Sequence, residues 1–258
     1  MRDNLKNIEY FKKYINENLK SYLKSKERIV QGIIPQERIL ILKRSFADSF
    51  VNVFAAKYSL GHPINELKES LMKAIFYTHE SWDGFWKIKT GNPTGSIVLA
   101  QYGLDAYDQM LWMLSLGYLL DVSEADFKKL VEVIDRDGVK DFLFEFIIRA
   151  KLKDRRMIAK ESYQEFFGVP NTFEKLRQAI NKTDKAKVEK LVKEFITKDW
   201  YKNHKNASWY NSHKSKHDIY FGYWSFETAA VVKIMGLDDS SFIHCQYYPK
   251  DLLRQETI

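Results

Sequence analysis

Residues 220–236 read YFGYWSFETAAVVKIMG, and apolar side chains would occur on nearly every side of a helix formed by this stretch. A helix that is apolar all round lies in the interior of a protein rather than on its surface. Gly236 is a typical C-cap, because glycine readily adopts the left-handed conformation that ends many helices. The stretch therefore predicts a helix in the protein interior.

The rest of the chain also has the spacing of helices. Apolar residues recur at steps of three and four, only 5 prolines and 11 glycines interrupt them, and no convincing strand alternation is visible. The third of the predicted helices would extend through Trp82 and Trp86. We expect helices that begin near Ile8, Ile39, Pro63, Ile97, Ser123, Lys140, Thr172 and Thr183, with breaks at 32–35, 92–95, 152–171 and 203–217.

These patterns predict an all-α fold, a multi-helix bundle with two helical subdomains that share a core. The chain has 258 residues, which exceeds the typical single domain of about 100 to 200 residues, and no obvious long linker divides it. We expect one subdomain over residues 1–122 and the other over residues 123–258.

The N-terminal residues and the cysteine content indicate a cytoplasmic protein. The first residues, MRDNLKNIEYFKKYINENLK, mix charged and apolar side chains, unlike the apolar run of a signal peptide or a membrane span. Cys245 is the single cysteine, which excludes an internal disulfide and a zinc site with several cysteines. Both observations fit a reducing compartment.

Charge is distributed unevenly along the chain. The net charge is +7, yet residues 61–150 hold 14 Asp and Glu against 9 Lys and Arg. Much of the basic excess lies in lysine-rich stretches such as Lys182–Lys193. The chain is therefore a basic molecule with an acidic middle, and we do not expect nucleic acid to be its main partner.

The C-terminal region resembles the PoNi family, the immunity proteins that protect bacteria from PoNe-type nuclease toxins. The resemblance rests on Tyr220, Gly222, Tyr223, Trp224, Glu227, Gly236, Asp238, Asp239, Tyr248 and Pro249 and on the residues around them. A second, shorter match lies at Ala56–Gly61. The resemblance implies an all-helical protein without cofactor or catalysis, which binds a cognate nuclease (DNase) domain and blocks it. Most of the matched residues have the character of architectural residues.

Two groups of residues were considered for catalysis or metal binding. Glu227 on the apolar helix is either a buried, hydrogen-bonded carboxylate or a catalytic one with a raised pKa, and the structural role is favoured because no partner group is evident. His213 and His217 have a spacing of four, which suits two metal ligands on a helix, but their polar surroundings indicate a solvated loop. We predict neither a catalytic site nor a metal site.

Basic segments with interleaved aromatic residues supply an alternative function. Residues 200–205 read WYKNHK, and Trp209 and Tyr210 follow closely. Lysines in such segments contact phosphates while aromatic rings stack on bases. The alternative hypothesis is therefore a helical protein that binds nucleic acid.

Acidic residues near the centre of the chain form the candidate partner-binding surface. On the predicted fourth helix, Asp105, Asp108 and Trp112 occupy a second face beside the core stripe, and Glu80 and Asp83 belong to the preceding helix. If the two helices pack side by side, these residues present an acidic patch with an aromatic anchor. Such a patch suits a partner with a positively charged nucleic-acid groove.

Overall fold

A computed structural model describes residues 1–90, 97–156 and 171–254, and it is predominantly helical, which confirms the predicted fold class. The chain divides into two compact units: unit 1 comprises Met1–Trp82 with Asn211–Tyr223, and unit 2 comprises Asp83–Tyr210 with Trp224–Ile258. The boundary predicted after residue 122 lies inside unit 2. The break predicted at 92–95 and most of the one at 152–171 lie outside the described residues. Within the described ranges, no helix has the length and apolar character needed to cross a membrane.

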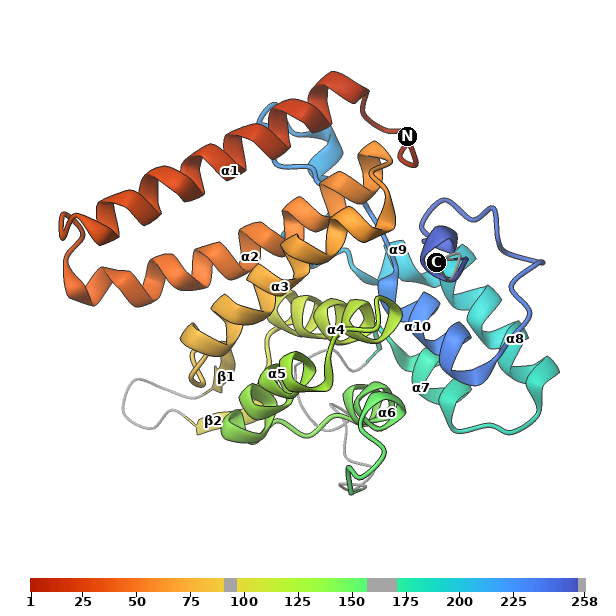
Figure 1. The fold of residues 1–258 in the computed structure, drawn as a ribbon. Helices are drawn as coiled ribbons and strands as arrows, with labels where there is room; N and C mark the ends of the chain where they lie inside the picture. Colours follow the sequence, from red (N-terminus) through yellow and green to blue (C-terminus); the bar gives the residue numbers. More distant parts are fainter. Residues whose placement is uncertain (91–96, 157–170, 255–258) are drawn as a thin grey trace. The chain divides into compact units, whose positions relative to one another are not determined.

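Unit 1 is built on three helices that follow one another in sequence. They are α1 (Ile8–Val30), α2 (Gln36–Leu60) and α3 (Ile64–Ser81), and α2 packs against both of the others (Figure 1). The side chain of Asn7 accepts a hydrogen bond from the N–H of Tyr10 and so caps α1. Gly61 ends α2 at a φ of 100°, a left-handed conformation that glycine adopts without strain.

Aromatic rings hold these three helices together. The ring of Tyr22 lies edge-on to Phe46 at 5.0 Å and to Phe50 at 4.8 Å between ring centroids. Its hydroxyl group and that of Tyr77 on α3 are hydrogen-bonded at 3.0 Å, so this buried polar pair is satisfied. The aromatic cluster therefore links α1, α2 and α3 through one contact network.

Residues 211–223 complete unit 1 although they are distant from its helices in sequence. This segment contains the short 3-10 helix η3 (Ser212–Lys214). The backbone N–H of Tyr220 donates to the hydroxyl of Tyr10 at 2.9 Å, and the Tyr220 hydroxyl donates to the carboxylate of Asp3. Ser59 on α2 donates to the carbonyl of Phe221 at 3.2 Å.

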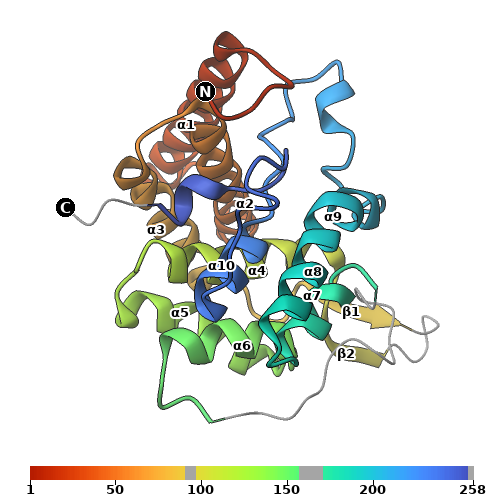
Figure 2. The same cartoon turned by 90° about the vertical axis from the view of Figure 1, so that its right-hand side faces the viewer.

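Unit 2 contains the remaining elements, with the buried helix α4 (Leu104–Leu119) packed against α5, α6 and α10 (Figures 1 and 2). Apolar side chains cover α4 nearly all round, which is why it lies in the interior. The other elements are β1 (Lys87–Thr90), β2 (Ile97–Tyr102), α5 (Glu124–Asp137), α6 (Phe142–Lys151), α7 (Glu174–Ile180), α8 (Lys185–Glu194), the π-helical turn η2 (Phe195–Asp199), α9 (Trp200–Asn203), α10 (Phe226–Met235) and the 3-10 helix η4 (Lys250–Leu252).

A small antiparallel sheet replaces part of a predicted helix. Residues from Ile97 onward were expected to be helical, but they form β2, which pairs with β1 so that Lys89 faces Val98. The helix begins only after Gly103. Asp137 at the end of α5 fixes the sheet, because its carboxylate accepts from the Tyr102 hydroxyl and its carbonyl accepts from Lys87, both at 2.7 Å.

Two other predicted helices are shorter in the structure. The third ends at Ser81, where Trp82 takes an extended conformation, so Trp86 does not continue it. The C-terminal aromatic helix begins at Phe226 rather than at residue 220, because Gly222 adopts a φ of 109° and the preceding residues belong to unit 1. Gly236 ends this helix in the left-handed conformation, as predicted.

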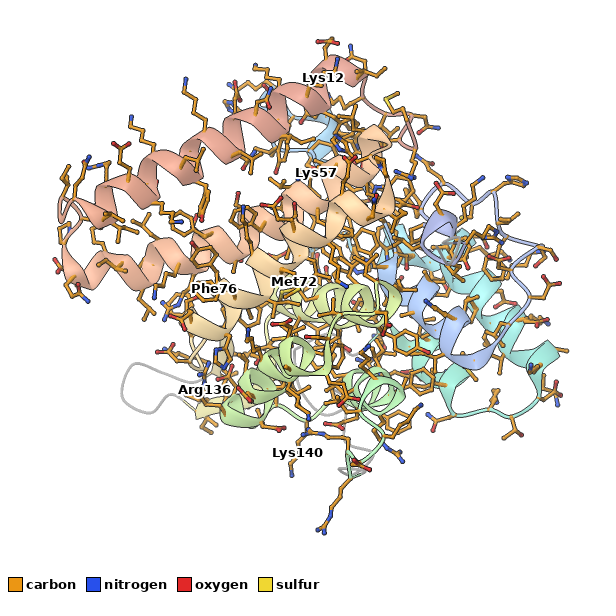
Figure 3. The ribbon with its side chains drawn as sticks, in the orientation of Figure 1. Lys12, Lys57, Met72, Phe76, Arg136 and Lys140 are labelled. Carbon is orange, nitrogen blue, oxygen red and sulfur yellow. The ribbon has the colours of Figure 1, made fainter. Side chains whose placement is uncertain are left out.

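We predict that Phe50→Ala destabilises the protein by about 3 to 5 kcal/mol, because it removes a buried ring from the centre of the aromatic cluster. Chemical denaturation followed by circular dichroism measures this loss. Phe76→Ala is the matched control, since this phenylalanine of α3 is 49 % exposed (Figure 3) and its removal should cost less than about 1 kcal/mol. Equal losses for the two variants would contradict the assignment of the core.

Candidate functional site

The predicted acidic face of α4 exists, but it packs against the protein's own chain. The carboxylate of Asp105 accepts a hydrogen bond from the N–H of Ser208 at 2.8 Å. One turn later, Asp108 accepts from the indole Nε1 of Trp209 at 3.1 Å and is buried. The ring of Trp112 lies 5.9 Å from that of Trp209 and is buried as well.

These positions correct two of the predicted partner-binding residues. Asp108 and Trp112 do not lie at the surface, because residues 200–209 cover this face of α4. Asp105 is exposed at the start of α4, and Asp83 is exposed in unit 2. Glu80 belongs to α3 of unit 1, where it forms an ion pair with Lys43 at 3.0 Å. Whether Glu80, Asp83 and Asp105 contact a partner stays a prediction.

His204, which lies in the predicted break at residues 203–217, is paired with Asp108. His204 is fully buried, and its Nε2 lies 3.4 Å from the Asp108 carboxylate. Its Nδ1 faces the carbonyl of Trp200, which only accepts hydrogen bonds, so this nitrogen carries a proton. Burial alone would lower the pKa of His204, but the Asp108 carboxylate and the Trp200 carbonyl outweigh it and raise the pKa.

Glu227 is a second buried acid in the same region of unit 2. Its Oε1 accepts from the indole Nε1 of Trp200 and from the hydroxyl of Ser225, both at 2.6 Å. Because that hydroxyl donates its only hydrogen to Glu227, the 2.6 Å contact between Ser225 and Thr228 has Thr228 as the donor. Burial raises the pKa of Glu227 to about 7, although the hydrogen bond from Ser225 lowers it.

Tryptophan rings connect the two acids. Trp200 stacks on Trp209 with centroids 5.5 Å apart, and each indole N–H reaches one of the acids, Glu227 and Asp108 respectively. Both rings are buried. The alternative hypothesis, in which these rings stack on nucleic-acid bases, is therefore wrong for the two tryptophans, because their faces are occupied inside the protein.

The other motif residues at the C-terminus make architectural contacts within one unit or the other. Tyr223 in unit 1 accepts from the backbone N–H of His213 at 3.2 Å. In unit 2, Tyr248 donates to Asp239 at 3.0 Å, and the same carboxylate forms an ion pair with Arg254 at 2.6 Å. The remaining members are Trp224, which is buried, Asp238, which accepts from the N–H of Ser240, and Pro249, which precedes η4.

The histidine pair considered for metal binding has other contacts. The Nδ1 of His213 lies 2.9 Å from the hydroxyl of Tyr223, and burial lowers the pKa of this histidine. His217 donates its backbone N–H to Ser215 in an exposed turn. Among the residues that the structure describes, no three His, Cys, Asp or Glu side chains come together as a metal site.

Burial decides what the Asp108–His204 and Glu227 groups do chemically. Acid–base catalysis requires that the acid or base reach its substrate, directly or through a water molecule. All three side chains are enclosed, with exposures of 1 %, 0 % and 0 %. They form a buried polar network with Trp200, Trp209 and Ser225 that ties α4, α9 and α10 together.

Comparisons with known proteins cover almost the whole chain. Residues 2–132 match the family model described as PoNe immunity protein (PoNi), N-terminal, and residues 139–252 match the model described as PoNe immunity proteins (PoNi), C-terminal. The crystal structure of protein PA2201 from Pseudomonas aeruginosa has a similar fold, with a TM-score of 0.67 at 15 % identity over 98 % of this chain and 89 % of that one. No curated protein matches significantly.

We predict that Asp108→Ala destabilises unit 2 by about 3 to 5 kcal/mol, because it leaves the buried His204, whose pKa Asp108 raises, without the acid that faces it. The control Asp105→Ala removes the same side chain one turn away on the exposed side and should cost about 1 kcal/mol or less. Thermal unfolding of both variants gives the comparison. A mild loss for Asp108→Ala would show that the pair is not ionised.

The raised pKa of Glu227 makes stability depend on pH. Its folded-state pKa of about 7 exceeds the ordinary value of 4.5, so folding favours the protonated form. The stabilisation is complete below about pH 4.5 and is lost as pH rises through 7, on the order of 3 kcal/mol in total. His204, whose pKa is also raised, acts in the same direction. Melting curves from pH 5 to 8 should show a falling melting temperature that Glu227→Gln makes flatter; parallel curves would refute this.

Proposed function

Because the chain belongs to the PoNe immunity protein family, we propose that it neutralises a cognate nuclease (DNase) toxin by direct, non-catalytic binding. The observation that carries the proposal is the match of both family models, which together span residues 2–132 and 139–252. Occlusion of the toxin's active site is the simplest mechanism. The cytoplasm, where the nucleic acid to be protected is found, is the compartment in which we place the encounter.

The interior of unit 2 supports a binding role over an enzymatic one. Asp108, His204 and Glu227 have the chemistry of acid–base catalysis and raised pKa values, and all three are enclosed. Glu227 and Asp108 accept hydrogen bonds from the indole groups of Trp200 and Trp209, respectively, and so connect segments of unit 2. We therefore expect this chain to act on its partner through residues at its surface.

The distribution of charge bears on how the toxin is blocked. Unit 1 carries 16 Lys and Arg against 10 Asp and Glu, and unit 2 carries 25 against 24. A nuclease groove that binds DNA is positive, and an inhibitor that imitates DNA phosphates presents a negative surface. The charge of this chain therefore favours binding by surface complementarity over imitation of the DNA backbone.

We expect co-expression with the nuclease encoded by the neighbouring gene to restore growth, and the two purified proteins to co-elute on size exclusion. Titration of the nuclease with the chain separates binding from catalysis: a stoichiometric binder abolishes DNA cleavage near equimolar ratio, whereas an enzyme that inactivates the toxin acts at far lower ratios. Cell death together with separate elution would reject the proposal for that pair.

A further inference from the structure

Residues 182–205 form a largely helical stretch with one apolar side and one basic side, in which residues 182–184 lead into α8 and residues 204 and 205 follow α9. The stretch comprises α8, the π-helical turn η2 and α9, which follow one another directly (Figure 1). Its inner side carries buried residues at helical spacing, namely Val188, Val192, Phe195, Ile196, Trp200 and His204. Its outer side is exposed and contains lysine as its only cationic side chain apart from histidine, with no arginine.

The acidic residues of this stretch are all engaged within unit 2. Each carboxylate has a partner within unit 2, and the pKa of Glu194 is lowered mainly by its hydrogen bond with Lys175 and also by the charges of Lys190 and Lys198. The four contacts are Asp184 with the N–H and ammonium group of Lys187, Glu189 with the N–H of Asp238 at 3.0 Å, and Glu194 and Asp199 with Lys175 at 3.0 and 2.7 Å.

Six lysines of the stretch remain at the surface, and together we name them the lysine face. None of them forms a side-chain hydrogen bond or an ion pair with another residue in the described part of the chain. Lys190 and Lys193 lie on the exposed side of α8. Lys198, Lys202 and Lys205 follow, separated by steps of four and three residues. The members are Lys182, Lys190, Lys193, Lys198, Lys202 and Lys205.

The lysine face concentrates charge in a unit that is nearly neutral overall. Such a patch creates a positive potential that speeds encounter with a negative surface and repels a positive one. Nuclease domains present both kinds of surface: a positive groove for DNA, and carboxylates of the kind that bind catalytic metal ions. The lysine face is complementary to carboxylates and is repelled by the groove.

We propose that the lysine face is the docking surface for a carboxylate-rich region of the cognate nuclease, an inference that rests on the proposed function. A nucleic acid is the less suitable partner. Trp200, the one tryptophan of residues 182–205, is buried, and arginine, which binds phosphate through two parallel hydrogen bonds, is absent from these residues. The ammonium groups of the lysine face suit ion pairs with carboxylates, and none of its members is an aromatic residue on which a base could stack.

The test compares charge reversal at two places on the full-length chain. Lys190→Glu with Lys193→Glu changes the lysine face, and Lys20→Glu with Lys24→Glu on α1 changes the net charge equally at other exposed lysines. Association rates with the purified nuclease are measured from low to physiological salt, and circular dichroism checks folding. We expect the α8 variant to associate at least about ten-fold more slowly than the control at low salt, with a weaker salt dependence. Lys→Gln at the same positions should give about half the effect.

The other possible results contradict either the proposed function or the inference about the lysine face. If the wild-type chain neither binds nor inhibits the nuclease, the proposed function fails. If the wild type binds and the two variants associate equally fast, the lysine face is not the docking surface. Faster association of the α8 variant would show that the contacted surface is basic, which overturns the inference. Unchanged nuclease binding with a loss of salt-steep binding to duplex DNA would assign the face to nucleic acid and overturn it as well.

Discussion

The pairing of Asp108 with His204 is the interaction on which unit 2 depends. It joins the buried helix α4 to α9, a four-residue helix that would have little stability by itself. Burial of two charges is unfavourable unless they meet each other and further hydrogen bonds. Trp209 and the Trp200 carbonyl provide those bonds, so this one contact requires two tryptophans to take defined positions.

The same network extends to the C-terminal helix through one side chain. The indole of Trp200 donates to Glu227 on α10, and its ring stacks on Trp209. Polar contacts therefore link three separate elements in the interior, which specifies how α4, α9 and α10 pack more narrowly than apolar contacts alone. Asp108 and Glu227 therefore stabilise the interior of unit 2, and contacts with a partner must be made by other residues.

Local signals in the sequence predicted much of the fold, and long-range partners account for what was missed. Ser123 caps α5 at the predicted start of that helix, and Gly236 ends α10. The face shared by Asp105, Asp108 and Trp112 was also predicted, since helical spacing determines it. The segment that covers this face was not predicted, because Trp209 is 101 residues from Asp108 in the chain. The four-residue spacing of Trp200 and His204 was the signal that residues 200–209 have a side that faces the protein interior. The helix predicted from Ile97 was wrong for a similar reason: β-branched residues such as Ile97 and Val98 also suit a strand, and the pairing with β1 that selects the strand is not visible in their local spacing.

Unit 1 is discontinuous in sequence, and this affects how it forms during synthesis on the ribosome. Its first three helices emerge early, but Tyr220, which bonds to Tyr10 and Asp3, lies 210 residues beyond Tyr10. A nascent chain cannot close this contact until residues 83–210 of unit 2 have also been translated. Domains commonly fold in order from the N-terminus, whereas here the first unit must wait for a segment that is synthesised after residues 83–210. The conformational search for that closure is long-range, the class of contact that slows folding most.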